Sequence, residues 1–360
     1  MKSAMIAMSG GVDSSVAAYL MQRAGYDCRG VTMRLYRKSD LGMACHKTCC
    51  AETDAEDASL VAFRLGMAFE ELDYSALFRY RVIERFAAAY EAGLTPNPCV
   101  DCNRFLKFET LLDYALAEGC DKLATGHYAR VGYSDALSRW QLRKAADESK
   151  DQSYVLYMLT QEQLAHLMLP LGNYHKTEIR RLAHEQGLVT AAKHESQDIC
   201  FVPDGDYGAF LERWRGRPYP CGALLDDAGR EIGRHRGAIR YTVGQRRGLG
   251  YAGGERLYVA GKDMASNTVT LASESALYHS TLLAADVNWL SIAEPAGPIR
   301  VTARTRYHQS ERAATAYPLP GHRVCVVFDE PQRAPTPGQA VVLYDGELVL
   351  GGGTIVKVEK

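Results

Sequence analysis

The feature that most constrains the fold is a glycine-rich loop near the start of the chain, SGGVDSS at residues 9–15. An apolar run at residues 4–8 precedes the loop, and an apolar-periodic stretch at residues 16–21 follows it. This order predicts a strand, a tight turn and a helix. The two glycines allow the backbone to bring N–H groups close to a ligand, and the positive end of the helix dipole favours a polyphosphate there. Ser14 or Ser15 is expected to cap the helix.

Up to about residue 200, predicted strands alternate with predicted helices. Strands are expected at about residues 27–35, 68–72 and 121–125, and helices at about 53–66, 75–92, 102–118 and 176–186. Short loops between such elements indicate a parallel sheet that is covered by helices on both faces. Ligands bind such sheets beyond the carboxyl ends of the strands. Met33-Arg34 and the TGHY segment at residues 125–128 are therefore expected near the glycine-rich loop.

The second half of the chain has a different character. Glycine and arginine become frequent after about residue 201, and short alternating segments with turn residues dominate from residue 286 onward. Such segments are typical of a small β-barrel. The predicted fold is an α/β domain with a doubly wound parallel sheet at residues 1–204, a small β-rich central domain at 205–279 and a C-terminal β-barrel at 280–360.

Positive charge is concentrated in one region of an otherwise balanced chain. The net charge of the 360 residues is −1, which argues against a generally basic protein. Ten arginines and only four acidic residues lie between Arg213 and Arg256. An arginine-rich segment suits contacts with phosphate, although a solvated surface is the alternative.

The apolar runs and the cysteine content of the chain indicate where the protein is located and what its cysteines do. No apolar run is long enough to span a membrane, and the first strand begins too close to Met1 for a targeting peptide, so a cytoplasmic protein is expected. Structural disulfides are rare in that compartment, so the ten cysteines suggest metal, cluster or sulfur chemistry. The CHKTCC cluster at residues 45–50 fits a loop better than a zinc site, because no second pair lies at finger spacing.

Two further cysteines stand in informative stretches. TPNPCVDCN at residues 95–103 has prolines that stiffen the chain. Cys102 is expected at the N-terminus of the following helix, where the helix dipole and the nearby charges of Arg104 and Lys107 would lower the pKa of the thiol. ESQDICF at residues 195–201 places Cys200 where a connection could return over the nucleotide site. For either cysteine, the alternative is a thiol that only packs.

Taken together, these stretches resemble one family, the tRNA-specific 2-thiouridylases, which use ATP to place sulfur at position 2 of the wobble uridine. The loop alone resembles the PP-loop of enzymes that cleave ATP to AMP and pyrophosphate. What is specific to the family is the order of three features along the chain: the PP-loop, then the TPNP stretch with its cysteine, then the second cysteine. The matching strings cover all three predicted domains: AMSGGVDSS (7–15), TPNPCVDCNRFLKF (95–108), ATGHYAR (124–130), KDQSY (150–154), SQDICFVPDGDY (196–207), YTVGQRRGLG (241–250) and RTRYHQ (304–309).

The resemblance implies a role for each matched residue. Cys102 would be the catalytic nucleophile, and Cys200 would carry a persulfide. ATP would be held by Ala7, Met8, Ser9, Gly10, Gly11, Val12, Asp13, Ser14, Met33 and Gly126. The target base would lie against Asn97, Pro98 and Cys99. Other parts of the tRNA would be contacted by His127, Lys150, Asp151, Gln152, Arg306, Tyr307 and Gln339. The central and C-terminal domains would hold the anticodon arm.

Chemistry gives these roles a consistent order. The 2-oxygen of uracil is a poor leaving group, and adenylation allows it to depart as AMP. Asp13 would hold Mg²⁺, which offsets the charge on pyrophosphate. A sulfur donor, such as a cysteine desulfurase or a sulfur-relay protein, would load Cys200, and Cys102 would release the sulfur and leave a disulfide with Cys200. The sequence leaves open which donor acts and whether the chain is a monomer.

One position departs from the commonest family pattern. Residue 99 is often aspartate in the family and is cysteine in this chain. Cys99, Cys102 and Cys200 could therefore ligate an iron–sulfur cluster, which would replace the persulfide route. The alternative is that Cys99 is a small loop residue. There are two alternative functions. A PP-loop ligase that acts on a small molecule would not need a pair of reactive cysteines. A non-enzymatic RNA-binding or sulfur-relay protein would not need an intact PP-loop.

Overall fold

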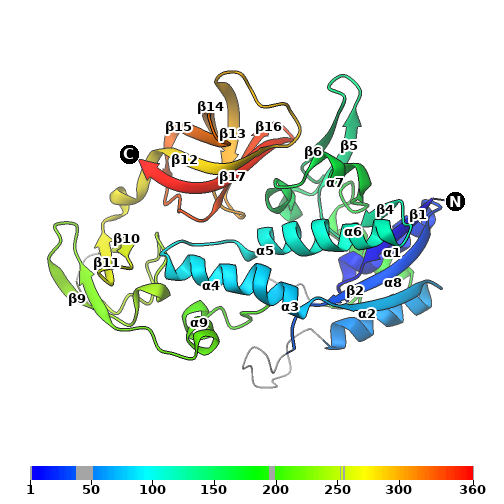
Figure 1. Ribbon diagram of the computed structural model, residues 1–360, viewed down its shortest axis with the longest axis horizontal. Helices are drawn as coiled ribbons and strands as arrows, with labels where there is room; N and C mark the ends of the chain where they lie inside the picture. Colours follow the sequence, from blue (N-terminus) through cyan, green and yellow to red (C-terminus); the bar gives the residue numbers. More distant parts are fainter. Residues whose placement is uncertain (1, 38–51, 194–198, 252, 254–255, 360) are drawn as a thin grey trace.

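The computed structural model describes residues 2–37, 52–193, 199–251, 253 and 256–359. The chain forms a layer of parallel strands with helices, a small four-stranded sheet and an eight-stranded sheet that includes a barrel (Figure 1). The predicted fold class is confirmed in its three parts. Within the described ranges, no helix is long and apolar enough to cross a membrane.

The N-terminal sheet is parallel throughout, with its strands in the order β3-β2-β1-β4-β7. Because β2 and β4 lie on opposite sides of β1, the winding reverses between β1 and β4. A ligand site is expected at that reversal, beyond the carboxyl ends of the two strands. The strand bounds are β1 Ser3–Ala7, β2 Asp27–Arg34, β3 Ala68–Asp73, β4 Lys122–Ala124 and β7 Leu167–Met168.

Alternate side chains of β1 pack against different helices, as expected for a strand with both faces covered. Ala4 and Ile6 join a core with α1, α2 and α8, whereas Met5 joins a core with α6. All three side chains are fully buried. The helix bounds are α1 Val12–Arg23, α2 Glu52–Arg64, α6 Leu111–Ala117, α7 Gln161–His166 and α8 Lys176–Glu185.

Two long helical segments lie side by side next to the parallel sheet (Figure 1). The first joins α3 Ser75–Phe78, a π-helical stretch Arg79–Ile83 and α4 Glu84–Glu91; the second joins α5 Pro98–Asp101, a π-helical stretch Cys102–Thr110 and α6. The second segment begins about one turn earlier than predicted. The reason is a cap: the Asn97 side chain accepts a hydrogen bond from the Cys99 N–H at 3.1 Å, and proline suits the first helical position.

The C-terminal barrel is closed because β12 pairs with both β15 and β17. Its sheet then continues from β17 to β6 and β5, a hairpin that the sequence pattern does not predict. The hairpin belongs to the N-terminal half of the chain, so that half and the barrel share one sheet. The bounds are β5 Arg130–Ser134, β6 Arg139–Arg143, β12 Tyr278–Trp289, β13 Ile299–Arg304, β14 Arg312–Leu319, β15 Arg323–Arg333, β16 Ala340–Asp345 and β17 Leu348–Glu359.

In its described residues, the central part contains one α-helix, α9, a short 3₁₀ helix at Ala238–Arg240 and a sheet with the strand order β10-β11-β8-β9. Phe210 of α9 packs with Phe86 of α4 and with Phe201 in one aromatic core. The core fixes α9 to the first of the two long helical segments. The bounds are α9 Tyr207–Arg215, β8 Gly222–Leu225, β9 Glu231–His235, β10 Tyr258–Asp263 and β11 Thr268–Ala272.

Candidate active site

The glycine-rich loop joins β1 to α1 in the way that the sequence predicts. Gly10 has a φ of +67°, in the left-handed region that favours glycine. A Cβ at this position would lie 2.1 Å from the backbone oxygen of Asp54, so a side chain does not fit. Gly11 caps α1 with extended backbone. The first amides of α1 therefore lie at the carboxyl end of the sheet, where a polyphosphate is favoured.

The serines of the loop brace its backbone and do not cap the helix, so that prediction is wrong. The helix begins at Val12, which places both serines inside its first turn. The Ser14 hydroxyl accepts a hydrogen bond from the Ser9 N–H at 3.1 Å and donates one to the Gly11 carbonyl at 3.1 Å. The Ser15 hydroxyl donates to the same carbonyl at 2.9 Å. These bonds hold the loop in shape without a side-chain cap over the N-terminal amides.

The segment after β4 lies against the glycine-rich loop, at the reversal of winding. A Cβ at Gly126 would lie 2.8 Å from the Ser14 backbone nitrogen. Only glycine permits so close an approach of two backbones. Met33, near the carboxyl end of β2, is partly buried against two of the hydrophobic cores. The structure thus brings Gly126 to the loop and places Met33 at the end of the neighbouring strand.

Asp13, in the first turn of α1, is paired with a lysine that sequence reasoning missed. The Lys176 ammonium donates to both carboxylate oxygens of Asp13, at 2.7 and 2.8 Å, and the Tyr128 hydroxyl donates to one of them at 2.7 Å. Lys176 is buried and is the first residue of α8. Positive charge is disfavoured at a helix N-terminus, so a lysine there was the one available signal of a carboxylate partner.

A second lysine, Lys193, joins the loop to α2. Its ammonium donates to the Gly10 carbonyl at 2.9 Å and pairs with Asp57 at 2.6 Å and with Asp54. Burial works against the charge, but the two carboxylates outweigh it and raise the pKa of Lys193. Lys193 is therefore a fixed positive charge at the base of the loop.

Cys102 lies about one turn inside its helix and not at the N-terminus, so the prediction of a lowered pKa is wrong. Burial is the largest effect and raises the pKa of the Cys102 thiol. The positive charge of Lys107 lowers this pKa, and the negative charge of Asp101 raises it further. The side chain is accordingly a protonated thiol at neutral pH. Cys99 occupies the helix N-terminus instead.

Cys200 is an exposed thiol whose backbone is firmly held. Its carbonyl accepts a hydrogen bond from the Tyr36 hydroxyl at 2.7 Å. The next residue, Phe201, is buried edge-to-face against Phe86, with 5.2 Å between ring centroids. Cys102 packs at the margin of the same aromatic core, so two cysteines far apart in sequence approach one core. The other predicted cluster, at residues 45–50, and residues 195–198 lie outside the described ranges.

The three candidate cluster ligands do not form a metal site in this structure. Cys99 and Cys200 are exposed, whereas Cys102 is partly buried. Among the described residues, which include all three cysteines, no three His, Cys, Asp or Glu side chains are grouped so that they could hold a metal ion. A cluster with one open iron needs three such thiols together. The donor set therefore does not fit an iron–sulfur cluster in this conformation.

Residues predicted to face the target base gather around the N-terminus of α5. Asn97 caps the helix, Pro98 is buried and Cys99 is exposed. Tyr307 reaches this place from the loop between β13 and β14. Burial, helped by the nearby Cys99, raises the pKa of Tyr307 to about 12, and a side-chain hydrogen bond with Gln152 opposes the rise. Cys99, Gln152 and Tyr307 therefore lie together, although they come from three separate segments.

Comparison with known proteins matches the whole chain. Family models match residues 2–204 (tRNA methyl transferase HUP domain), 209–273 (tRNA methyl transferase PRC-barrel domain) and 279–355 (Aminomethyltransferase beta-barrel domain). A tRNA-specific 2-thiouridylase MnmA of Acetivibrio thermocellus is 46% identical, and one of Moorella thermoacetica is 48% identical, each over 98% of this chain and 99% of the relative. The chain belongs to the tRNA-specific 2-thiouridylase (MnmA) family.

The family resemblance drawn from the sequence is thereby confirmed, and with it the class of enzyme. A further MnmA relative, from Desulforamulus reducens, is 47% identical over 100% of this chain and 98% of its own length. A solved structure that matches the chain has a lower sequence identity and covers less of it. A 4-thiouridine synthetase–RNA complex with bound ATP is 17% identical over 56% of this chain and 45% of that chain, with a TM-score of 0.34.

In this member of the MnmA family, three residues predicted to touch tRNA have polar groups that are engaged within the protein. His127 is buried and bonded to Thr125 at 2.8 Å, and burial holds its pKa well below the usual range. The Gln339 amide donates to the Thr95 carbonyl at 2.8 Å. Arg306 donates through one nitrogen to two backbone carbonyls and a threonine hydroxyl, at 2.9 to 3.1 Å. These contacts join the TPNP loop and the central part to the barrel.

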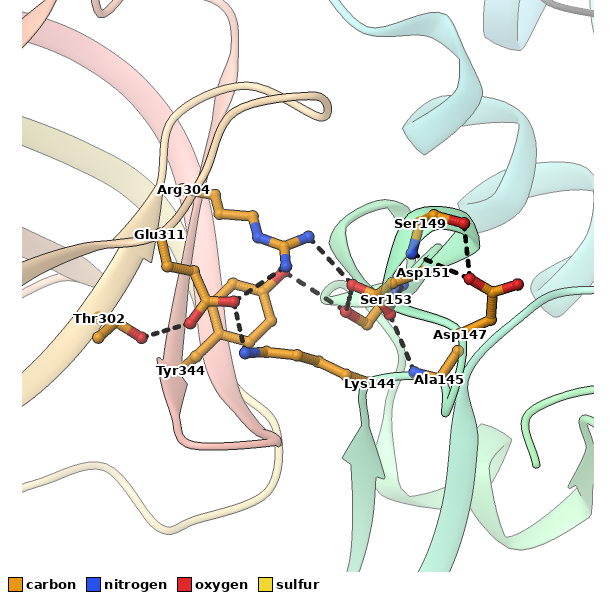
Figure 2. Close-up of polar contacts among 10 residues, drawn as sticks. All are labelled: Lys144, Ala145, Asp147, Ser149, Asp151, Ser153, Thr302, Arg304, Glu311 and Tyr344. Atoms are coloured by element: carbon orange, nitrogen blue, oxygen red, sulfur yellow. Dashed lines mark hydrogen bonds and ion pairs between the residues drawn. The ribbon is translucent and has the colours of Figure 1, made fainter. Parts of the chain in front are cut away.

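Asp151, another predicted tRNA contact, lies in a buried network of charges between the N-terminal half and the barrel (Figure 2). Its side chain is 0% exposed and pairs with Arg304 at 3.0 Å. Arg304 also pairs with Glu311 at 2.9 Å, and Glu311 pairs with Lys144 at 2.5 Å. The carboxylate of Asp151 is therefore enclosed by the protein. Lys150, one residue earlier, is only partly buried.

This network sets the position of two residues that are predicted to contact tRNA. Backbone N–H groups and a serine hydroxyl complete the hydrogen bonds to Asp151. The guanidinium carbon of Arg304 lies 5.1 Å from the centroid of the Tyr344 ring. Asp151 is followed at once by Gln152, and Arg304 is followed three residues later by Tyr307. Pairing Asp151 with Arg304 thus fixes how the two segments that bear these side chains face each other.

Within the described ranges, more than half of the arginines of the central segment form ion pairs, which the sequence does not predict. Arg215 bridges Glu84 at 2.7 Å and Glu91 at 3.0 Å, and so ties α9 to α4. Of the paired arginines, Arg215 and Arg240 are the least exposed, at 24% and 26%, and these two are the ones withdrawn from contact with phosphate. Six of the segment's ten arginines form ion pairs, namely those at positions 213, 215, 217, 230, 234 and 240.

Removing Arg304 should destabilise the protein far more than removing a neighbour on the same strand. Arg304→Met leaves Asp151 buried without its cation, a loss that costs about 3 to 5 kcal/mol in the free energy of unfolding. Arg300 lies on β13 too but pairs with Asp329 at an exposed site, so Arg300→Met is the matched control and should change little. Denaturant unfolding measures both variants. Equal midpoints would contradict the importance of the buried pair.

The Cys102 thiol should titrate above the range of an exposed cysteine, and Lys107→Met should raise its pKa further. Lys107 supplies the charge that favours the thiolate, so its loss leaves burial unopposed. The measurement is the pH dependence of alkylation by iodoacetamide in a Cys99→Ser background, followed by mass spectrometry of the Cys102 peptide. Lys357→Met, an exposed change in the barrel, is the control. A midpoint below that of free cysteine would contradict the effect of burial.

Proposed function

We propose that this protein replaces the 2-oxygen of a tRNA wobble uridine with sulfur and consumes ATP to AMP and pyrophosphate. The observation that carries this proposal is that Cys102 packs at the margin of one aromatic core, while Phe201, the residue after Cys200, is buried within it. The end of β2 contributes to the same core. That strand lies next to the one that leads into the PP-loop. The supporting comparison is a chain nearly half identical to proteins named tRNA-specific 2-thiouridylase. A PP-loop ligase for small molecules needs no such pair of thiols.

ATP would lie in the loop at residues 7–14, with Gly126 and Met33 on either side and phosphate oxygens on the first amides of α1. Asp13 fits Mg²⁺, because its side chain is 32% exposed and this ion is commonly held by one or two carboxylates together with substrate phosphates. When bound, the ion offsets the charge on pyrophosphate. Lys176 would then share its positive charge between Asp13 and the phosphates.

Adenylation and sulfur transfer would follow in order. The uridine 2-oxygen attacks the α-phosphorus of ATP, and pyrophosphate leaves. Sγ of Cys102 attacks Sγ of a persulfide on Cys200, the S–S bond of the persulfide breaks, and the terminal sulfur takes up the Cys102 proton and leaves as hydrosulfide. Hydrosulfide attacks C2 of the uridine, and AMP leaves. The cysteines are left as a disulfide, which a thiol reductant must reduce before a protein persulfide can load Cys200 again.

Asn97, Pro98, Cys99, Gln152 and Tyr307 would surround the target base. The base must leave its stack to reach them, as is usual for enzymes that act on single bases. Residues 1–204 would hold ATP and carry out the chemistry. Residues 205–279 and 280–360 would hold the anticodon arm, although the buried ties of Arg306 and Gln339 suggest that these two residues act by positioning the domains.

A thiolation assay tests the proposal. The protein is incubated with ATP, an unmodified tRNA transcript and a cysteine desulfurase with cysteine as sulfur source, and 2-thiouridine is measured by mass spectrometry. Cys200→Ser should abolish thiolation and leave the Kd for tRNA unchanged, because the thiol is exposed and its backbone is held by other groups.

Cys221→Ser is the matched control, since Cys221 is an exposed thiol in the central part of the chain. It should thiolate at the wild-type rate. Thiolation that persists without Cys200 would rule out the persulfide route through this residue. Cleavage of ATP that depends on a small molecule and not on tRNA would overturn the proposed substrate.

A further inference from the structure

Three arginines surround one phenylalanine on the two long helical segments. The guanidinium carbons of Arg81, Arg85 and Arg104 lie 5.0, 5.1 and 5.3 Å from the centroid of the Phe105 ring. Arg81 and Arg85 belong to the first segment, and Arg104 and Phe105 belong to the second, which also carries Cys102. We name these four residues the Phe105 cluster. Among the described residues, no other aromatic ring has three cationic groups at such distances, and Tyr344 comes next with two.

The protein itself neutralises only part of this charge. Arg85 pairs with Asp101 at 3.2 Å. Across the described ranges, no carboxylate lies within ion-pair distance of Arg81 or Arg104. Arg85 and Arg104 are exposed. The cluster thus presents a net positive charge at the surface, unlike the central arginines, most of which are paired.

An exposed aromatic ring extends the same surface. Tyr80 is 69% exposed, and the guanidinium carbon of Arg81 lies 5.8 Å from the centroid of its ring. Aromatic faces beside unpaired guanidinium groups are the combination that binds single-stranded nucleic acid, through stacking on bases and bidentate contacts with phosphates. A solvated helix face would not need the ring to be exposed or the arginines to be gathered.

We propose that the Phe105 cluster binds the sugar–phosphate backbone of the tRNA next to the target nucleotide, an inference that rests on the proposed function. Phe105 follows Cys102 by three residues in the same π-helical stretch, so the two residues lie within one helical turn of each other. An RNA whose base reaches Cys99 and Cys102 therefore has its flanking phosphates within reach of Arg81 and Arg104. The cluster holds the anticodon loop on the same helix that presents the thiols.

The test is the affinity for an unmodified tRNA transcript across salt concentrations. Arg81→Gln combined with Arg104→Gln should raise the Kd on the order of tenfold at low salt. It should also lower the slope of log Kd against log salt concentration by about 1.4 to 1.8. Each lost phosphate contact lowers this slope by about 0.7 to 0.9, and the variant loses two contacts. The Kd for ATP should stay unchanged. Arg81→Lys with Arg104→Lys keeps the charge and should retain most of the affinity and the slope.

A matched control removes two charges elsewhere. Arg23→Gln with Arg181→Gln changes exposed arginines at the C-terminal end of α1 and on α8, and should alter neither the Kd nor the slope. Equal values for the cluster variant and this control would overturn the proposal. A second result would also overturn it. The cluster variant would bind tRNA with unchanged affinity, lose thiolation with a protein persulfide donor and keep thiolation with free sulfide. The surface would then bind the donor protein and not the tRNA. A wild-type protein that neither binds nor thiolates tRNA would instead overturn the proposed function.

Discussion

The buried pair between Asp151 and Arg304 is the interaction on which the arrangement of the site most depends. Two opposite charges that are shielded from water must stay together, because separating them leaves each one buried without compensation. The pair therefore holds the segment around Asp151 against the strand that leads to Tyr307. The sheet shared by β6 and β17 and the bond from Gln339 to the TPNP loop act in the same direction. The side chains that are proposed to surround the base can come from three segments because these contacts hold the barrel against the N-terminal half.

The sequence predicts best those features that depend on neighbouring residues. The strand, turn and helix around Gly10 follow from local pattern and steric limits, and the close approach at Gly126 follows from the rules of parallel sheets. The helix before Cys102 starts a turn earlier than predicted because Asn97 provides a better cap than the prolines alone suggest. A one-turn shift moves a thiol from the positive helix end into a buried place, and so reverses the expected change in its pKa.

Features that depend on distant partners could not be predicted in this way. The β5–β6 hairpin pairs with a strand about two hundred residues later in the chain, and Lys176 meets Asp13 from another helix. The arginines show most clearly that local sequence does not predict the environment of a side chain. Arg306 is engaged with backbone carbonyls, Arg304 is enclosed by carboxylates, and Arg104 lies exposed on an aromatic ring. Nothing in the local sequence separates these three environments, so counting arginines overestimated the central segment and overlooked the helices beside Cys102.

The raised pKa of Cys102 bears on the order of the proposed chemistry. A neutral thiol reacts slowly with oxidants and alkylating agents, so burial protects Cys102 between turnovers. A persulfide on Cys200 is more acidic than a thiol and would be an anion at the same pH. The proton that Cys102 retains is then available to the terminal sulfur as the persulfide bond breaks, which makes hydrosulfide the leaving group and not the less stable sulfide dianion. A thiolate at Cys102 would lack this proton and would repel the anionic persulfide. Because the thiolate is the nucleophile in such an exchange, Cys102 gives up its proton as it attacks, and the terminal sulfur that leaves is the group that takes this proton up.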